Sequence, residues 1–456
     1  MPIPAVESGR PSTSASQESE PKLAYAWYVV IVLTTCYTLS FIDRQILGLL
    51  VDPIKKEFGI SDFRLGLLQG PAFALLYTLL GLPMGRIADR KSRRNLIATG
   101  VFFWSLMTAA CSIARSYASL FLARVGVGVG EATLGPSAFS LISDYFPKER
   151  LGTALSVYSA GIFVGAGLAN IVGGIVAQAV STLPPVGLPL VGTIAPWRLT
   201  FLIVGIPGLL IGFLVYTVRE PLRKNILRRS DGGISQLGLG DVLAQMKLRW
   251  QSVAGVSLGL SAQAMCNYAL QFWGNPFFMR VFGWSKQRSG VVLGILILTT
   301  GLIGMYVGGK LCDKWLRAGL REAPLKVAVI STIGAGVFFC LAMSIQQVTW
   351  TVVMLTPALF FLAMPVGSSY AALQLIFPNQ MRGQVSAIVI FTINIGGLTL
   401  GPPMVGLLND ILGEQMVGYS LAITLGLASL VSAILFRSIY VPYRRHYEML
   451  EAGSSA

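Results

Sequence analysis

Apolar residues occur in long, nearly uninterrupted stretches along this chain, and short polar segments separate them. A stretch of about 20 apolar residues is long enough to cross the hydrocarbon core of a bilayer as a helix. The pattern therefore predicts an all-α membrane protein with twelve transmembrane helices, at 26–50, 65–86, 94–115, 117–140, 152–180, 197–218, 252–280, 288–313, 325–346, 350–376, 383–408 and 416–440.

A polar, basic segment over residues 219–251 separates the first six apolar stretches from the last six. We therefore expect an N-terminal six-helix bundle at 23–218 and a C-terminal six-helix bundle at 252–441, joined by a cytosolic linker. Residues 1–22 are rich in Pro, Ser and Glu and lack an apolar core, so they predict a disordered cytosolic tail rather than a signal peptide. Residues 442–456 are expected to form a second cytosolic tail.

The two sets of stretches resemble each other. Gly-Arg-Ile-Ala-Asp-Arg begins at Gly85 after the second stretch, and Gly-Lys-Leu-Cys-Asp-Lys begins at Gly309 after the eighth. A Phe-Pro pair follows the fourth stretch at Phe146 and the tenth at Phe377. Two matched landmarks in matched loops predict a duplicated unit and two pseudo-symmetric bundles.

Charge distribution refines this picture. Only 12% of the residues are charged, against about 25% in a typical soluble protein. The net charge of +15 comes from basic residues at the ends of the stretches, which indicates membrane topology rather than nucleic-acid binding. Of the 35 Lys and Arg, 25 fall on the side of the two termini and 8 on the other side. This bias predicts a multi-pass plasma (inner) membrane protein with both termini in the cytoplasm.

Residues that usually hold metals or catalyse reactions are scarce. The five cysteines form no Cys-x-x-Cys pair, and the single histidine, His446, lies near the C-terminus. The stretch Gly304–Lys310 fits the spacing of a phosphate-binding loop, but Leu311 stands where Ser or Thr is needed. We therefore expect no metal, no cofactor and no enzymatic activity.

Four charged residues interrupt the apolar stretches: Asp43 and Arg44 in the first, and Arg124 and Glu131 in the fourth. Charges at membrane depth are costly and usually face one another or a wet cavity. If the chain enters from the cytosol, Asp43 and Arg124 lie at one depth and Glu131 lies about 10 Å deeper. An Asp43–Arg124 pair is sterically reasonable, and Arg44 could serve either acid, so the pairing stays open.

A basic motif follows the second stretch, from Gly85 to Arg94. It resembles the signature of the major facilitator superfamily, and this resemblance implies the major facilitator fold. An Asp among arginines in a tight interhelical loop can hold two helix ends together and release them when the bundles rock. The residues expected to form this cytosolic gate are Gly85, Asp89, Arg90, Arg93, Arg94 and Asp313.

A narrower resemblance covers about the first 180 residues. Five segments resemble Spinster-type lipid transporters, namely Phe41–Gln45, Lys56–Asp62, Gly81–Arg90, Arg124–Ala132 and Asp144–Pro147. Members of this family move sphingosine-1-phosphate or lysophospholipids, so the resemblance implies an amphiphilic lipid as substrate. The second half of the chain matches mainly at the level of the superfamily.

Asp43 and Glu131 are the candidate proton-coupling residues. Burial favours a neutral carboxyl group and a nearby arginine favours the carboxylate, so opening the site changes the balance. The alternative is a permanent ion pair that only locks two helices together. Arg44 and Arg124 offer planar donor groups that suit an anionic headgroup, or they are fully neutralised by the two acids.

The seventh, tenth and eleventh stretches supply candidate cavity-lining residues in this architecture. These are Met265, Tyr268, Phe272, Trp273, Tyr370 and Asn394. Ordinary helix packing is the alternative role for each of them.

The sequence as a whole predicts a monomeric secondary active transporter that moves an amphiphilic lipid by alternating access and couples this movement to protons. Its partners are the lipid substrate, protons and the bilayer. A drug or organic-anion carrier of the same fold is the alternative within transport. A non-transporting membrane sensor is the alternative from another class.

Overall fold

The structure is a computed structural model, and it describes residues 23–188, 192–221, 223, 239–378 and 381–454. The predicted tail at 1–22 and about half of the predicted linker, residues 222 and 224–238, lie outside these residues. Nearly all of the described chain is helical. The exception is a hairpin in which β1 (Val186–Leu188) pairs antiparallel with β2 (Gly192–Ile194).

The first half of the chain forms one helical bundle, and the second half forms another. The first bundle contains α1 (Leu23–Leu49), α2 (Val51–Phe58), α3 (Asp62–Gln69), α4 (Pro71–Arg90), α5 (Arg93–Ala110), η1 (Cys111–Ile113), α6 (Tyr117–Glu131), α7 (Leu134–Tyr145), α8 (Lys148–Ser181) and α9 (Pro196–Val215). We call it the N-half.

The second bundle, the C-half, follows helix α10 (Leu239–Leu248). It contains α11 (Trp250–Phe282), α12 (Lys286–Arg317), α13 (Ala323–Ser344), α14 (Val348–Ala363), α15 (Pro365–Gln374), α16 (Arg382–Ile393), η2 (Asn394–Leu398), α17 (Thr399–Leu412), η3 (Glu414–Met416), α18 (Val417–Ser438) and α19 (Tyr440–Ser454). The linker and the C-terminal tail predicted from the sequence thus contain helices α10 and α19.

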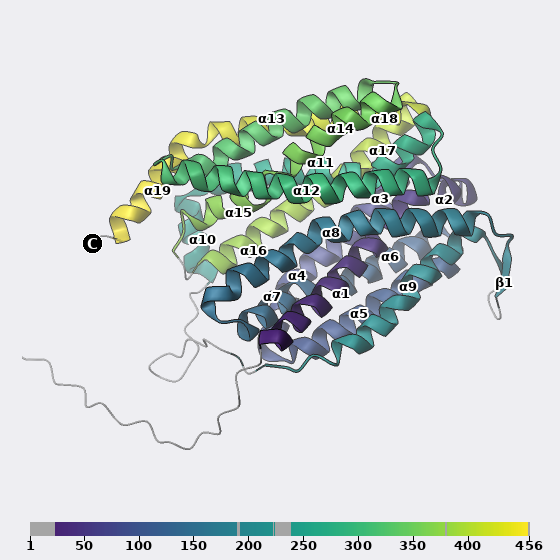
Figure 1. The fold of residues 1–456 in the computed structure, drawn as a ribbon, viewed down its shortest axis with the longest axis horizontal. Coiled ribbons are helices and arrows are strands. Elements are labelled where there is room, and N and C mark those ends of the chain that lie inside the picture. The colour runs from purple at the N-terminus through teal and green to yellow at the C-terminus, as the bar shows by residue number, and fades with distance from the viewer. Residues whose placement is uncertain (1–22, 189–191, 222, 224–238, 379–380, 455–456) are drawn as a thin grey trace, which may run out of the picture.

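The two halves lie side by side, with α8 and α12 along their boundary (Figure 1). One end of the molecule carries the start of α1 together with α10 and α19, and we call it the terminus end. The opposite end carries the β-hairpin and α2, and we call it the hairpin end.

The predicted transmembrane pattern is confirmed. Ten helical segments in the described part of the chain are long and apolar enough to cross a membrane, and Val348–Ala363 is a shorter apolar helix. The remaining predicted span is α11, which is 33 residues long. It is less apolar than the others because Gln263, Asn267, Gln271 and Asn275 interrupt it. The protein is therefore an all-α multi-pass membrane protein.

Glycines allow α8 and α12 to approach closely across the boundary between the halves. A methyl group added at Gly294 would lie 2.5 Å from the carbonyl oxygen of Gly167, and one added at Gly290 would lie 2.4 Å from that of Asn170. Since real side chains do not tolerate such distances, only glycine fits at these two positions of α12.

Candidate functional site

The four charges in the apolar stretches come together inside the N-half. Arg44 on α1 donates hydrogen bonds from Nε and Nη2 to the same carboxylate oxygen of Glu131 on α6, at 2.7 and 2.5 Å. The Arg44 side chain is 9% exposed and that of Glu131 is 1% exposed. The pairing that the sequence left open is therefore Arg44 with Glu131.

Arg124 forms no hydrogen bond with the Asp43 carboxylate in the described structure, although the sequence left this pairing open. Its Nη1 group donates to the backbone carbonyl of Asp43 at 3.0 Å, and its Nη2 group donates to Gln69 Oε1 at 3.4 Å. Arg124 is fully buried. Its guanidinium group thus ties α6 to the backbone of α1 and to α3.

The Asp43 carboxylate is fully buried, and neither of its oxygens forms a hydrogen bond within the described residues. Arg124, Glu131, Trp104 and Thr108 all act on it electrostatically or as nearby polar groups. Trp104 Nε1 and Thr108 Oγ1 also lack hydrogen-bond partners in the described structure. Asp43 is therefore a buried acid with polar groups close by but no hydrogen bond of good geometry to its carboxylate.

Aromatic rings surround the Arg44 guanidinium group. Its central carbon lies 4.6 Å from the centre of the Phe73 ring, 4.9 Å from that of Tyr77 and 5.4 Å from that of Phe41. Tyr268 on α11 interacts with Arg44 electrostatically from the C-half. Such rings stabilise a cation while leaving its surroundings apolar on one side.

A chain of side-chain amides leads from this site into the C-half. Gln45, the neighbour of Arg44, donates to Gln271 on α11 at 2.5 Å, and Gln271 donates to Asn267 at 2.6 Å. One turn further along α11, Asn275 donates to Asn170 on α8 at 2.7 Å. The three amides of α11 are spaced four residues apart, so they share one face of the helix and join the two halves.

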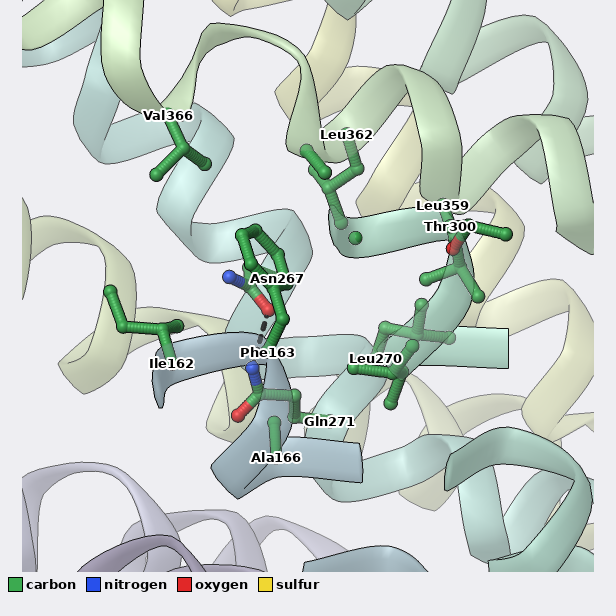
Figure 2. A pocket seen from close by; sticks show the side chains of 13 residues that line it. Ile162, Phe163, Ala166, Asn267, Leu270, Gln271, Thr300, Leu359, Leu362 and Val366 are labelled. Atoms are coloured by element: carbon green, nitrogen blue, oxygen red, sulfur yellow. Dashed lines mark hydrogen bonds between the residues drawn. The ribbon is translucent and has the colours of Figure 1, made fainter. Parts of the chain in front are cut away.

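A cavity lies between the halves beside this chain of amides, and its empty volume is about 480 Å³. Figure 2 shows the bonded pair Asn267 and Gln271 on its wall, and Thr300 is a third polar residue of the lining. The rest of the wall is mostly apolar, with Ile162, Phe163, Ala166, Leu270, Ile297, Gly301, Leu359, Leu362, Ala363 and Val366. Small-molecule sites commonly combine such apolar walls with a few polar groups.

The described residues that the sequence predicted to line a cavity are not on the wall of this one. Phe272 and Trp273 are buried in helix packing, because the Phe272 carbonyl meets Gly48 of α1 and Trp273 Nε1 donates to Pro402. Met265 packs against the glycines of η2 and α17, and Tyr268 faces Arg44 instead of the cavity wall. Asn394 opens the π-helix η2, away from the cavity lining. The side chain of Tyr370 lies outside the described residues.

Ionic contacts that the sequence analysis did not predict close the hairpin end. Asp62, at the start of α3, is fully buried. It accepts hydrogen bonds from Lys55 at 2.7 Å, from Arg280 of α11 at 2.5 and 3.2 Å, and from Asn409 of α17 at 3.0 Å. Arg280 also pairs with Asp52 at 2.8 Å. These bonds hold the N-half against the C-half.

Asp410 of α17 adds a second connection at the same place. Its two carboxylate oxygens accept the backbone N–H groups of Asp62 and Phe63, each at 2.9 Å. These are the first N–H groups of α3, which have no acceptor within their own helix. A side chain of the C-half thus caps a helix of the N-half. Arg280 and Asp410 lie at the ends of predicted membrane spans. Charged residues at such positions usually reflect only the topology of the chain, so nothing in the sequence marked these two as contacts between the halves.

The predicted gate motif divides into a bonded part and an exposed part. Arg93 is 1% exposed; it donates to Glu220 at 2.8 Å, to Ser140 at 2.9 Å and to Asp144. Burial alone would raise the pKa of Glu220, but hydrogen bonds from the Arg94 N–H group, Arg93 and Ser92 outweigh this effect and lower it. Arg93 therefore locks α5 to α7 and to the segment after α9.

The exposed part of the motif contains Asp89 and Arg90 at the end of α4 and Asp313 near the end of α12. A methyl group added at Gly85 would meet only Pro136 Cβ, at 3.8 Å. The Arg94 guanidinium carbon lies 5.8 Å from the centre of the Tyr216 ring. The expected gating bonds of Asp89 and Asp313 are not found within the described part of this structure. In the regions described, no cluster of three or more His, Cys, Asp or Glu could hold a metal ion.

Two helical halves, buried charges at their centre and a cavity between them define a membrane transporter. The chain belongs to the Major Facilitator Superfamily, whose sequence model matches residues 33–398. The fold and family resemblance expected from the sequence are therefore confirmed.

Spinster proteins are among its relatives. It is 26% identical to protein spinster homolog 1 of Xenopus tropicalis over 84% of this chain and 72% of that protein. It is 25% identical to the sphingosine-1-phosphate transporter SPNS2 of the same organism, over 89% of this chain and 79% of that protein. An MFS-type efflux pump of Mycolicibacterium smegmatis is 28% identical over 92% of this chain and 94% of the pump.

Solved structures agree with these relatives. A bacterial homolog of the human lysosomal transporter Spinster, in an inward-facing and unoccupied conformation, aligns with a TM-score of 0.74. The alignment is 26% identical and covers 93% of this chain and 97% of the homolog.

Proposed function

We propose that this protein moves an amphiphilic lipid, of lysophospholipid or sphingosine-1-phosphate type, across the membrane by alternating access coupled to protons. The main support for proton coupling is the difference between the surroundings of the two buried acids, Glu131 and Asp43. Glu131 is paired with Arg44, whereas the Asp43 carboxylate forms no ion pair with a described residue and has only the Trp104 N–H and Thr108 hydroxyl groups as close polar neighbours. Asp43 can accept a proton without breaking an ion pair, and Glu131 can accept one when Arg44 releases it.

The cavity between the halves supports the substrate class. Its wall is mostly apolar with a few polar side chains, the composition that small-molecule sites commonly have. Its apolar wall suits a hydrocarbon chain, and Asn267 and Gln271 offer hydrogen bonds to a polar group. Arg44, connected through Gln45 and Gln271, is the candidate contact for an anionic headgroup. Arg124, which has no exposed surface, positions α1 instead.

The direction of opening follows from the hairpin-end contacts and from the charge bias. The bonds of Asp62 and Asp410 close the hairpin end. With both termini in the cytoplasm of a plasma (inner) membrane, this is the state open toward the cytoplasm. The similarity to an inward-facing Spinster homolog supports this assignment. In the opposite state, Asp89 and Asp313 would form the bonds that close the terminus end. We expect the protein to work as a monomer.

Purified protein in proteoliposomes tests the coupling. Labelled lysophospholipid should enter faster under an imposed pH gradient, and both Asp43→Asn and Glu131→Gln should abolish this stimulation. Exchange of lipid without a gradient should continue in both variants, because it needs no net proton movement. Glu149→Gln, at an exposed carboxylate near the start of α8, serves as the control. Unchanged gradient-driven uptake in both variants would reject the proposed coupling.

A drug or organic-anion carrier is the second candidate function. The efflux pump of Mycolicibacterium smegmatis and the probable L-galactonate transporter of Escherichia coli, 25% identical over 79% of this chain, favour it. Competition separates the two functions, because lysolipids should block uptake of a labelled lysolipid whereas small sugar acids should not. Absence of any flux in reconstituted, folded protein would favour a sensor instead.

A further inference from the structure

A second hollow lies at the terminus end of the C-half, away from the charged site. It is an open groove with an empty volume of about 850 Å³ between α10, α11 and α16. Its lining consists of Leu243, Met246, Lys247, Trp250, Val253, Ala254, Ser257, Leu258, Ile388 and Thr392. From Lys247 to Leu258 the groove follows the end of α10 and the start of α11.

The groove and its rim expose large apolar side chains. Leu248 is 70% exposed, Trp250 62% and Leu258 50%. On a membrane-spanning helix such side chains face the hydrocarbon region, and an exposed tryptophan near a helix end is typical of the membrane interface. The groove therefore opens to the bilayer, and its mouth near Trp250 lies at headgroup level.

Arg249 lies in the chain between Lys247 and Trp250, which both line the groove, and it has no acid partner among the described side chains. Arg249 is half-buried, its Nε atom has no hydrogen-bond partner in the described structure, and its Nη1 group reaches only Gln245. Its central carbon lies 5.3 Å from the centre of the Phe377 ring. Burial lowers the pKa of Arg249, and no carboxylate among the described side chains offsets this effect.

Three other buried arginines of this protein are paired with carboxylates, whereas the fully buried Arg124 is bonded only to neutral oxygens. Arg44, Arg93 and Arg198 each meet a carboxylate at 2.8 Å or less. Around Arg249, by contrast, the neighbouring charges are also positive: Lys247 lines the groove, and Arg249 and Arg445 both act on His446 as cations. This arrangement calls for an anion from outside the protein.

We propose that the groove binds one anionic phospholipid of the surrounding bilayer. Its phosphate lies against Arg249 and Lys247, and one acyl chain follows the groove past Ala254 toward Leu258 and Ile388. Basic positions between transmembrane helices on one side of a membrane are suited to such headgroups. The bound lipid connects α10 to α11 and α16, so it fastens the start of the C-half to the helix that leads into the π-helix η2. This site is separate from the proposed transport pathway.

Native mass spectrometry of the full-length protein tests the proposal. After delipidation, the protein is incubated with phosphatidylglycerol or phosphatidylcholine of identical acyl chains. We expect one phosphatidylglycerol to be retained at least about tenfold more tightly than phosphatidylcholine, because each basic residue near the surface is worth about fivefold in affinity. Equal retention of the two lipids would overturn the proposal.

Variants separate the headgroup from the chain. Arg249→Gln combined with Lys247→Gln should reduce phosphatidylglycerol retention by about tenfold or more, whereas Arg437→Gln, at an exposed arginine elsewhere on the terminus end, should not. Ala254→Trp fills the groove without removing a charge and should also abolish retention. Thermal unfolding shows whether each variant is folded. If either the double variant or Ala254→Trp retains the lipid as the wild type does, the groove is not the binding site.

Discussion

Arg44 on α1 donates two hydrogen bonds to Glu131 on α6, and both side chains are nearly excluded from solvent. The pair joins the first and fourth predicted spans inside the N-half. Hydrogen bonds between charged groups are worth about 1.5–3 kcal/mol each, so breaking this pair requires a compensating partner. A proton on Glu131 or an anionic headgroup beside Arg44 is such a partner.

The first prediction concerns the shape of the Arg44 side chain. Arg44→Lys keeps the charge but loses the planar group that donates twice to Glu131 and stacks on Phe73 and Tyr77. Loss of one charge-assisted hydrogen bond of about 1.5–3 kcal/mol should lower gradient-driven uptake by roughly tenfold or more. Initial rates of lysolipid uptake into proteoliposomes measure this effect.

Arg64→Lys is the matched control for this substitution. Arg64 is exposed, and its guanidinium carbon lies 5.9 Å from the centre of the Tyr117 ring. Its replacement should leave uptake within about twofold of wild type, since an exposed contact of this kind contributes about 0.5–1 kcal/mol or less. Wild-type uptake by Arg44→Lys would show that a charge alone suffices at this position.

The second prediction concerns closure of the hairpin end. Asp62→Asn keeps the shape of the side chain but removes the charge that Lys55 and Arg280 share. Removing one partner of a buried ion pair costs up to about 3–5 kcal/mol. In this variant Arg280 keeps only the more exposed Asp52 and Lys55 only the exposed Glu414. The variant should therefore favour the state in which the hairpin end opens. Spin labels at Lys56 on α2 and Ile411 on α17, both exposed, should show a longer distance population.

Glu414→Gln tests whether burial causes this effect. Glu414 also pairs with Lys55, at 2.7 Å, but its side chain is 54% exposed. An exposed pair contributes about 0–1 kcal/mol, so the label distances should stay close to those of the wild type. Equal distance distributions in Asp62→Asn and wild type would rule out Asp62 as a determinant of closure.

The helices were predictable because the apolar stretches match the thickness of a bilayer, and the duplicated loop motifs revealed the two halves. The four central charges were also predictable, since Asp43, Arg44, Arg124 and Glu131 stand out in apolar surroundings. Their pairing was not. It depends on how α1 and α6 are rotated and on the reach of each side chain, which are properties of the packed bundle.

Other parts of the site depend on contacts between distant segments. Asp62 meets Arg280 and Asn409, which are 218 and 347 residues away in the chain. Nothing local distinguishes these residues from ordinary span-end residues. The cavity-lining face of α11 carries Asn267, Leu270 and Gln271 rather than the aromatic residues expected from the sequence. The four-residue spacing of Asn267, Gln271 and Asn275 was the available signal, since three amides on one face of a membrane helix need polar partners.

The third prediction concerns the contact between α8 and α12. A methyl group at Gly294 would lie 2.5 Å from both the Gly167 carbonyl oxygen and Ile171 Cγ1. Because backbone cannot rotate away as a side chain can, Gly294→Ala should push the two helices apart and destabilise the protein by about 1–3 kcal/mol. Thermal unfolding in detergent measures this loss. Gly309→Ala on the same helix meets nothing within 4 Å and should leave stability unchanged or slightly raised.

The fourth prediction concerns the docking of α19. Glu322, before α13, is 3% exposed and accepts hydrogen bonds from Arg444 of α19 at 2.7 and 3.3 Å. Burial opposes ionisation of Glu322, but the bonds from Arg444, its own backbone and Lys326 lower its pKa to about 2. A lowered pKa in the folded state stabilises docking above the unfolded value of about 4.5, and this contribution is lost as the pH falls toward 2.

Glu322→Gln should therefore weaken the docking of α19 at neutral pH, and the solvent exposure of Arg444 limits the size of this effect. Hydrogen exchange of the α19 backbone measures this, and the difference between wild type and variant should persist at pH 5 and shrink only below about pH 4.5. Because His446 contacts Ser252 in both proteins, its titration affects both equally and drops out of the difference between variant and wild type. Glu448→Gln removes the exposed pair with Arg321 and should change exchange much less. A difference that disappears between pH 7 and 5 would contradict the assignment of this contribution to Glu322.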